Sequence, residues 1–303
     1  MKSVHVTQGH EKGIGLEVFF KSLYFLSPKQ ISCLVLHADK KSVEENLQNL
    51  RLDFEISSNK LRINHLSLNV NWIKNKLGTQ SLTSLHSALE DIEKKNAVLF
   101  TLPTSKDQLK GYLGHTELLR DHFKNPDLGM YFYNQQSQIL LLTDHLSLEN
   151  LLALVSKDFI VDRLVCSFAS LQKWKRPIDD IFISGLNPHA GEGGLLGEED
   201  LYIHQALSSP KLKEFKIAGP YSGDTLTFQA KSSKDLLIYL YHDQGLAPFK
   251  ATNGLIGVNM TLGLPFPRLS PDHGTAFQLY GKNLADYRGC LYSLREALTF
   301  VTG

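Results

Sequence analysis

Short runs of apolar and β-branched residues alternate along this chain with longer segments of helical period, and this alternation limits the fold more than any other feature. The apolar runs lie at residues 4–7, 31–36, 97–101, 138–142, 181–184, 236–241 and 255–259. The helical patterns lie at residues 15–25, 42–50, 81–94, 148–174, 198–207 and 286–299. Such alternation is typical of α/β proteins with a largely parallel sheet. We therefore expect an α/β fold.

Two segments depart from this simple alternation. Residues 51–77 alternate only in part between apolar and polar side chains, which predicts strand pieces near a sheet edge. Residues 148–174 are apolar on more than one helical face, which predicts one or two buried helices.

Charge and hydropathy exclude several classes of partner. The chain of 303 residues has 32 basic and 31 acidic side chains and no clustered basic tract, so nucleic acid is not an expected partner. No run approaches the about 18 apolar residues of a membrane-spanning helix, and the first residues lack the apolar segment of a signal peptide. The three cysteines form no CxxC pair. We expect a cytoplasmic protein without a membrane partner.

Three of the twelve histidines directly follow predicted strands. His145 comes after the run at 138–142, His189 after the run at 181–184 and His242 after the run at 236–241. In open parallel sheets, ligands bind at the carboxyl ends of the strands. If the strands are parallel, the three imidazoles share one edge and suit a divalent metal. The alternative interpretation is that each is a turn histidine bonded to backbone carbonyls.

The residues around these histidines add to the case for a site. The segment NPHAGEGG at 187–194 holds three glycines, which allow close approach of the backbone to a ligand. In the loop at 241–250, Asp243 is placed to orient a metal ligand and Lys250 to pair with an anion. A solvated surface turn would need neither.

Further groups are candidates for binding a phosphate or carboxylate. Arg268 lies in a proline-rich turn and Asn259 ends the preceding predicted strand. Thr116 is a candidate helix cap that leaves His115 facing an anion, although plain capping is the alternative. The glycines at 13–15 do not form a GxGxxG loop, so a standard Rossmann cofactor site is not predicted.

Four segments together resemble the 4-hydroxythreonine-4-phosphate dehydrogenase family of vitamin B6 biosynthesis. They read NPHAGEGG at 187–194, YHDQG at 241–245, GVNMTLGLP at 257–265 and DHGTA at 272–276. The family is similar in fold to isocitrate and isopropylmalate dehydrogenases. The resemblance therefore implies a two-domain α/β/α protein, with residues 1–112 and 251–303 in the first domain and 113–250 in the second, which contributes to a dimer interface.

The resemblance also implies roles for individual residues. It makes His145, His189 and His242 the metal ligands. It assigns the phosphorylated substrate to His115, Thr116, Lys250, Asn259 and Arg268. It places Lys106, Asp224 and Asp243 near the reacting hydroxyl as candidate catalytic groups, and Gly274, Thr275 and Ala276 at the cofactor. The implied active site is shared by the two subunits of a homodimer.

The implied reaction is oxidation of the C3 hydroxyl of 4-phosphooxy-L-threonine by NAD or NADP, followed by decarboxylation to 3-amino-2-oxopropyl phosphate. A divalent ion held by neutral imidazoles, whether Zn, Mg, Co or Mn, would lower the pKa of the hydroxyl. The resemblance does not select the metal, the nicotinamide cofactor or the general base.

Three positions depart from the family pattern and keep alternatives open. Leu16 stands where the family has proline in its first loop, and Gln278 and Tyr280 follow the DHGTA segment in place of an acid and a small residue. A sister dehydrogenase of a phosphorylated threonate, erythronate or cyclic diol is one alternative. A metal-dependent hydrolase and a regulatory relative without cofactor binding are the others.

Overall fold

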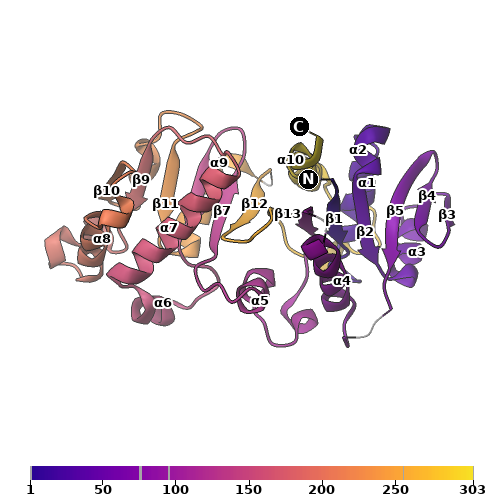
Figure 1. Cartoon of the computed structure of the whole chain (residues 1–303), viewed down its shortest axis with the longest axis horizontal. Helices are drawn as coiled ribbons and strands as arrows, with labels where there is room; N and C mark the ends of the chain where they lie inside the picture. Colours follow the sequence, from indigo (N-terminus) through magenta and orange to yellow (C-terminus); the bar gives the residue numbers. More distant parts are fainter. Residues whose placement is uncertain (1, 75–76, 95, 255, 303) are drawn as a thin grey trace. The chain divides into compact units, whose positions relative to one another are not determined.

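The protein divides into two compact units. The computed structural model describes residues 2–74, 77–94, 96–254 and 256–302. The first unit comprises Met1–Leu118, Leu255–Asn259 and Pro265–Gly303, and the second comprises Leu119–Gly254 and Met260–Leu264 (Figure 1). The boundaries differ from those expected at 112/113 and 250/251, because helix α5 (His115–His122) and strand β12 (Val258–Leu262) each run from one unit into the other.

The first unit is built on a mainly parallel sheet. Its strands lie in the order β13-β6-β1-β2-β5-β4-β3. The pairs from β13 through β6, β1 and β2 to β5 are all parallel. Strand β4 is antiparallel to both of its neighbours, β5 and β3. The strand bounds are β1 (Val4–Thr7), β2 (Leu34–Ala38), β3 (Phe54–Ile56), β4 (Lys60–Ile63), β5 (Leu66–Trp72), β6 (Val98–Thr101) and β13 (Arg268–Pro271). β3, β4 and β5 are thus the strands expected near a sheet edge in this part of the chain.

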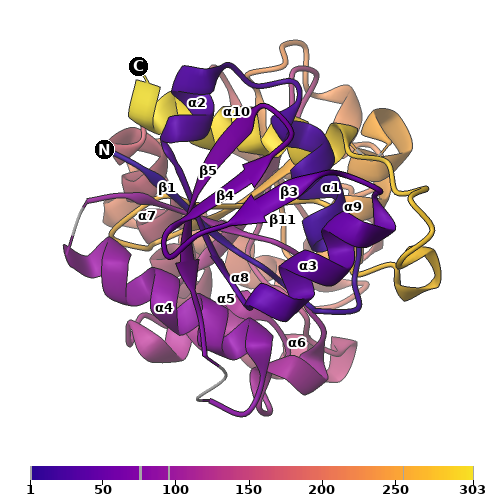
Figure 2. The ribbon, with the colours of Figure 1, turned by 90° about the vertical axis from the view of Figure 1, so that its right-hand side faces the viewer.

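Helices cover both faces of this sheet. They are α1 (Gly15–Leu23), α2 (Pro28–Ser32), α3 (Lys40–Asn49), α4 (Gln80–Lys94) and α10 (Arg288–Thr302), with short 3₁₀ turns η1 (Lys106–Leu109) and η5 (Phe277–Leu279). α4 packs on β1, β2 and β6, and α10 packs on β13, β6 and β1. Figure 2 shows α4 and α10 on opposite sides of the strands. β1 and β6 are consequently buried along their whole length, His5 and Thr7 of β1 included.

The second unit holds a smaller sheet with the order β10-β9-β11-β8-β7. All pairs are parallel except β7 with β8. Its strands are β7 (Gly129–Tyr133), β8 (Gln138–Leu141), β9 (Ile181–Ser184), β10 (Ile217–Tyr221) and β11 (Leu236–Tyr239). Its helices are α6 (Leu148–Leu154), α7 (Lys157–Lys173), α8 (Glu199–Leu207) and α9 (His242–Asn253), with 3₁₀ turns η2 (Pro188–Gly194), η3 (Pro210–Leu212) and η4 (Leu226–Phe228).

Local chemistry explains where the sequence-based boundaries were wrong. The strand expected at 31–36 begins only at Leu34, because a capping box between Ser27 and Gln30, with Pro28 in the first turn, starts helix α2. The strand expected at 255–259 is observed as β12 from Val258, and residue 255 lies outside the described residues. The strands β7, β10 and β13 were not predicted.

Two helical segments also differ from expectation. Residues 148–174 form two helices, because Ser156 caps α7 by accepting a hydrogen bond from the Phe159 amide. The predicted loop at 241–250 is instead the first part of helix α9, which accommodates Pro248 in its interior. Within the described segments, no helix has the length and apolar character to cross a membrane.

Candidate active site

His145 and His242 lie side by side at the carboxyl ends of two neighbouring strands of the second unit. β8 and β11 pair in parallel with Leu141 opposite Tyr239, so both segments leave the sheet at the same edge. The two imidazole centroids are 5.0 Å apart, with 42° between the ring planes. The structure thus brings together two of the three histidines that the sequence singles out, and their role as metal ligands stays a prediction.

A carboxylate fixes the orientation of the His242 ring. Nδ1 of His242 is 2.7 Å from Oδ1 of Asp243, its neighbour in the first turn of α9. With Nδ1 engaged in this way, Nε2 is the nitrogen that His242 offers to a ligand. A pair of facing imidazoles, one oriented by a carboxylate, is a donor set that fits a divalent ion such as zinc, cobalt or manganese.

His189 lies in an unusual left-handed turn. Every residue from His189 to Gly194 has positive φ, with φ 52° at His189 and Ala190 and 44° at Glu192. This conformation costs a residue other than glycine about 1–2 kcal/mol. Strain of this kind persists only where the surrounding structure holds it in place, and it concentrates at functional sites.

The buried carboxylate of Asp200 holds the turn. It accepts hydrogen bonds from the backbone amides of Leu186 (2.7 Å) and Asn187 (3.0 Å) and from the Asn187 side chain (2.9 Å). Gly185 packs so closely on Ala190 that a Cβ at this glycine would lie 2.6 Å from the Ala190 Cα. The sequence analysis missed Asp200, although its place in the first turn of α8 beside the NPHAGEGG segment is a usable signal.

His189 also lines an open pocket of about 570 Å³ in the second unit. Asp224, Asp243 and Gln244 line it too, and Oε1 of Gln244 is buried without a hydrogen-bond partner among the described residues. The structure does not bring His145, His189 and His242 together as three donors within 4.8 Å of one another; in the described chain that condition is met only by a group elsewhere in the protein. A single described chain therefore supplies a facing pair of imidazoles and a third one apart from it.

Arg268 and His115 form an electrostatic pair in the first unit. Arg268 is buried on β13 and donates a hydrogen bond from Nη2 to the Thr101 hydroxyl (2.6 Å). Burial lowers the pKa of Arg268 to about 10. Desolvation, and next the Arg268 charge, lower the pKa of His115 to about 3. At neutral pH the pair is one cation beside one neutral imidazole, and an added anion stabilises such an arrangement.

The other predicted substrate residues are divided between the units. Asn259 lies on β12, and its Oδ1 is buried without a hydrogen-bond partner among the described residues. Thr116 is buried inside the first turn of α5 and does not cap it, since α5 already begins at His115. Lys250 is exposed on the last turn of α9, in the second unit.

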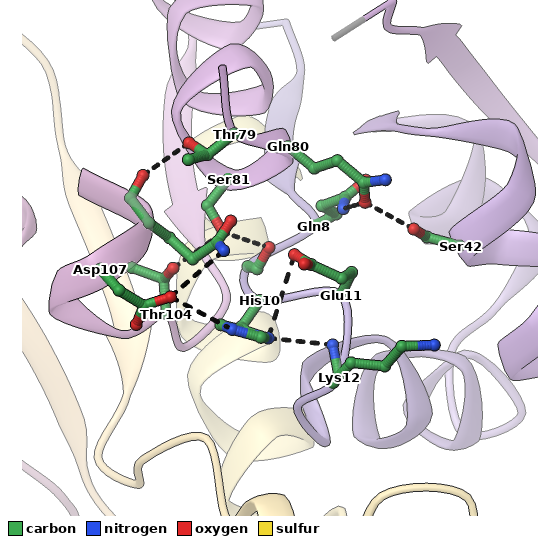
Figure 3. Close-up of polar contacts among 12 residues, drawn as sticks. Gln8, His10, Glu11, Lys12, Ser42, Thr79, Gln80, Ser81, Thr104 and Asp107 are labelled. Carbon is green, nitrogen blue, oxygen red and sulfur yellow. Dashed lines mark hydrogen bonds and ion pairs between the residues drawn. The ribbon is translucent and has the colours of Figure 1, made fainter. Parts of the chain in front are cut away.

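A second polar cluster in the first unit was not predicted. Figure 3 shows His10 between Asp107 on one side and Glu11 and Lys12 on the other. The Lys12 amide donates to His10 Nδ1 (2.9 Å), which leaves Nε2 facing Asp107 Oδ2 at 3.9 Å. Gly9 is required before it, because it has φ +68° and a Cβ there would lie 2.3 Å from the Pro103 carbonyl oxygen. His10 comes only three residues after β1, and this place just beyond a strand was the available signal.

The segment predicted to bind the cofactor packs against this same loop. The Ile14 amide donates to the carbonyl of Thr275 (3.0 Å), and the rings of His10 and Phe277 meet edge to face at 4.7 Å. Ala276 has a left-handed conformation, and a Cβ at Gly274 would meet nothing within 4 Å. The open space at Gly274 beside the half-exposed Phe277 ring fits a flat, aromatic cofactor group.

Two of the three residues that depart from the family pattern, Leu16 and Tyr280, are accommodated by contacts with their neighbours. Leu16 is buried in α1, which starts at Gly15 without the family's proline. Tyr280 donates a hydrogen bond to Glu45 (3.2 Å), and its ring lies 5.1 Å from the Lys12 ammonium. Gln278 is exposed.

The remaining catalytic candidates are exposed and lie in different units. Lys106 begins η1 in the first unit, next to Asp107. Asp224 lies in the second unit, where the hydroxyl of Ser222 donates to it at 2.6 Å. This hydrogen bond, and also the nearby His189, lower the pKa of the Asp224 carboxyl. Asp224 is therefore held in its ionised form.

A family model described as Pyridoxal phosphate biosynthetic protein PdxA matches residues 29–300. The chain belongs to this family. A 4-hydroxythreonine-4-phosphate dehydrogenase of Sulfurihydrogenibium sp. (strain YO3AOP1) is 32% identical over 317 residues, covering 98% of each chain. A D-threonate 4-phosphate dehydrogenase of Cupriavidus necator is 34% identical over 222 residues, covering 71% of this chain and 66% of that protein. As a PdxA protein, the chain is an oxidoreductase, so the hydrolase alternative is wrong.

Solved structures confirm the expected fold class. The crystal structure of 4-hydroxythreonine-4-phosphate dehydrogenase from Klebsiella pneumoniae matches with a TM-score of 0.82 at 27% identity, covering 100% of both chains. Isocitrate dehydrogenase from Methylococcus capsulatus matches with a TM-score of 0.55 at 10% identity, covering 100% of this chain and 86% of that one. This PdxA protein therefore has the two-unit α/β fold of isocitrate dehydrogenase.

The support of the His189 turn by Asp200 can be tested by substitution. We expect Asp200→Asn to lower the free energy of unfolding by about 2 kcal/mol, because an amide group would face backbone N–H donors that lose their acceptor. We also expect faster hydrogen exchange at the amides of Leu186 and Asn187. Glu199→Gln is the matched control, since Glu199 accepts a bond only from the Asn187 side chain in the described contacts. Equal stability of wild type and Asp200→Asn would contradict this account.

Proposed function

We propose that this PdxA protein oxidises the C3 hydroxyl of 4-phosphooxy-L-threonine with NAD or NADP and releases CO₂ to give 3-amino-2-oxopropyl phosphate, a step of pyridoxal 5'-phosphate biosynthesis. The main support for this proposal is the pair of neighbouring imidazoles, His145 and His242, at the carboxyl ends of β8 and β11. A second support is that a relative matched over 98% of this chain is named a 4-hydroxythreonine-4-phosphate dehydrogenase. We also propose the cytoplasm as its compartment.

The substrate phosphate is assigned to Arg268 and its neighbours. Arg268 supplies a buried positive charge, and His115 beside it is neutral at pH 7, so its N–H can donate without adding a second cation. Thr116 and Asn259 add a hydroxyl and a buried amide. Lys250, exposed on the last turn of α9, is a further cation in this proposal.

The metal is assigned to the imidazoles. His145 and His242 would hold a divalent ion, with Asp243 keeping His242 in the tautomer that presents Nε2. Such an ion supplies Lewis-acid chemistry: it lowers the pKa of a bound hydroxyl and favours loss of CO₂ from a β-keto acid. The left-handed turn at 188–194 presents the third imidazole, His189, at the pocket.

The nicotinamide cofactor, which supplies the electron acceptor, is assigned to the first unit. Gly274, Thr275 and Ala276 would hold it together with the loop that carries His10, because the two segments are joined by the bond from the Ile14 amide to Thr275. The exposed ring of Phe277 offers a stacking surface. This arrangement needs no GxGxxG loop.

The contacts favour Lys106 as the group that accepts the hydroxyl proton. Asp243 already pairs with His242, and the lowered pKa of Asp224 makes its carboxylate a weak base. Lys106, exposed at the start of η1, is the remaining candidate of the three.

A substrate comparison tests the proposed reaction against its nearest alternative. We expect metal-loaded protein to reduce NAD⁺ or NADP⁺ with 4-phosphooxy-L-threonine and to lose this activity after chelation. The relative from Cupriavidus necator makes 4-phosphorylated D-threonate the second substrate to compare. A higher kcat/KM for the threonate would replace the proposed substrate while leaving the shared phosphate site in place.

A separate measurement tests the regulatory alternative raised by Leu16, Gln278 and Tyr280. Calorimetric titration with NAD⁺ that shows a normal affinity would remove this alternative.

We further propose a homodimer in which a second copy supplies the third imidazole. Large apolar side chains are exposed in the second unit: Leu148 (58%) and Leu152 (49%) share one face of α6, and Leu195 and Phe228 are each 78% exposed. Burial of such groups stabilises subunit contacts. His189 is itself exposed, apart from the pair His145 and His242.

Complementation between inactive variants tests this shared site. We expect His145→Ala and His189→Ala each to be inactive alone, but their mixed dimers to keep one intact site. Random mixing then restores about a quarter of the wild-type rate, since half of the dimers are mixed and half of their sites are intact. The matched control is a mixture of His145→Ala with His242→Ala, which stays inactive because both ligands come from one copy. No recovery in the first mixture would overturn the shared site.

A further inference from the structure

Two buried histidines in the first unit take no part in the proposed reaction. His5 lies on β1 and His37 on β2, and they are diagonal neighbours because Thr7 is the residue opposite His37. Both side chains are almost completely buried, with 1% and 0% exposure. Helix α4, which packs on both strands, brings Asp91 to the same place. Figure 1 labels α4, β1 and β2 in the first unit.

These three side chains form a compact set of ligand atoms. One ring nitrogen of each histidine and one Asp91 oxygen all lie within 4.8 Å of one another, and the described residues contain no other such group of three histidine, cysteine or acidic side chains. Nδ1 of His5 is 2.8 Å from Nε2 of His37 and 3.7 Å from Oδ2 of Asp91. The ligands of a tetrahedral ion, bound at about 2.1 Å, lie about 3.4 Å apart, so small shifts suffice.

The outer nitrogens of both rings have partners that allow metal binding. His5 Nε2 is 3.0 Å from the Ser3 hydroxyl, and His37 Nδ1 is 2.9 Å from the Ser87 hydroxyl. If each ring carries its proton on the outer nitrogen and donates it to serine, both inner nitrogens direct lone pairs into the shared space. A cation removes the repulsion between those lone pairs. In the neutral pair one ring proton lies between the two inner nitrogens. Metal binding would move this proton to the outer nitrogen of the same ring, so no proton is released to solvent.

The carboxylate is oriented and the set can be reached from solvent. The Asn71 amide donates to Asp91 Oδ2 at 2.9 Å, which is the kind of support that metal-binding carboxylates receive. Ser87, the partner of His37, also lines a pocket of about 260 Å³ together with Thr83 and Glu90. Asp91 itself is partly exposed, with 24% of its side chain accessible, so an ion and its water can reach the set at this carboxylate.

We propose that His5, His37 and Asp91 form a second metal site, for a divalent transition-metal ion of the kind that binds imidazole, such as Zn²⁺ or Co²⁺. The site has two nitrogen ligands and one oxygen ligand, with the fourth position taken by water. It ties β1, β2 and α4 together within the first unit. It is independent of the proposed reaction and of the histidines in the second unit.

Cobalt binding to the full-length protein, freed of metal by chelation, tests the site. We expect equilibrium dialysis with Co²⁺ to show one bound equivalent per chain that Asp91→Asn and His37→Asn both lose, together with its visible absorption. His65→Asn is the matched control, because His65 is an exposed histidine of the same unit and should leave this equivalent unchanged. Zn²⁺ should raise the Tm of wild type more than that of Asp91→Asn.

Two results separate the outcomes. If His37→Asn fails to fold by circular dichroism, Asp91→Asn decides the test, since Asp91 is partly exposed and the substitution keeps its shape. Equal Co²⁺ binding and equal Zn²⁺-dependent Tm shifts in wild type and Asp91→Asn would show that the two rings only share a proton, and would overturn the proposal. Failure of Co²⁺ to bind at the imidazoles of the second unit would count against the proposed function. It would not change the comparison between wild type and Asp91→Asn, which tests only the second metal site.

Discussion

Parallel pairing of β8 and β11 is the constraint on which the candidate active site depends. Two parallel neighbours in register must end at the same edge of the sheet, and here the residues that follow them include His145 and His242, whose rings meet at 5.0 Å. Both strands are fully buried, and the residues just before the histidines are mainly apolar, so the imidazoles become available only beyond the ends of the strands. The neighbouring parallel strand β9 leads in the same way into the turn that carries His189.

The two units provide different chemistry, and each is stabilised by its own contacts. In the second unit, the buried carboxylate of Asp200 holds a strained left-handed turn, and Asp243 orients an imidazole. In the first unit, a buried Arg268 lies beside a neutral His115. The proposed reaction uses this division.

The sequence predicts more of the sheet than of the site. The strand at 181–184 was predicted with its observed bounds, because fully buried strands appear as uninterrupted apolar runs. α9 was missed because Gly245 and Pro248 resemble a loop, although the helix tolerates them. The turn at 188–194 needs the distant Asp200, and the pairing of His5 with His37 needs strand register; neither is visible in local patterns. The sequence still singles out His145, His189 and His242, because each comes soon after an apolar run that can be recognised as a strand.

A crystal structure of the zinc-loaded protein, with anomalous scattering recorded at the zinc edge, tests the central claim most directly. The account predicts an anomalous peak within about 2.1 Å of a nitrogen of both His145 and His242, completed by His189 from a second copy of the chain. A zinc-loaded, catalytically active protein with no peak between His145 and His242 would contradict it.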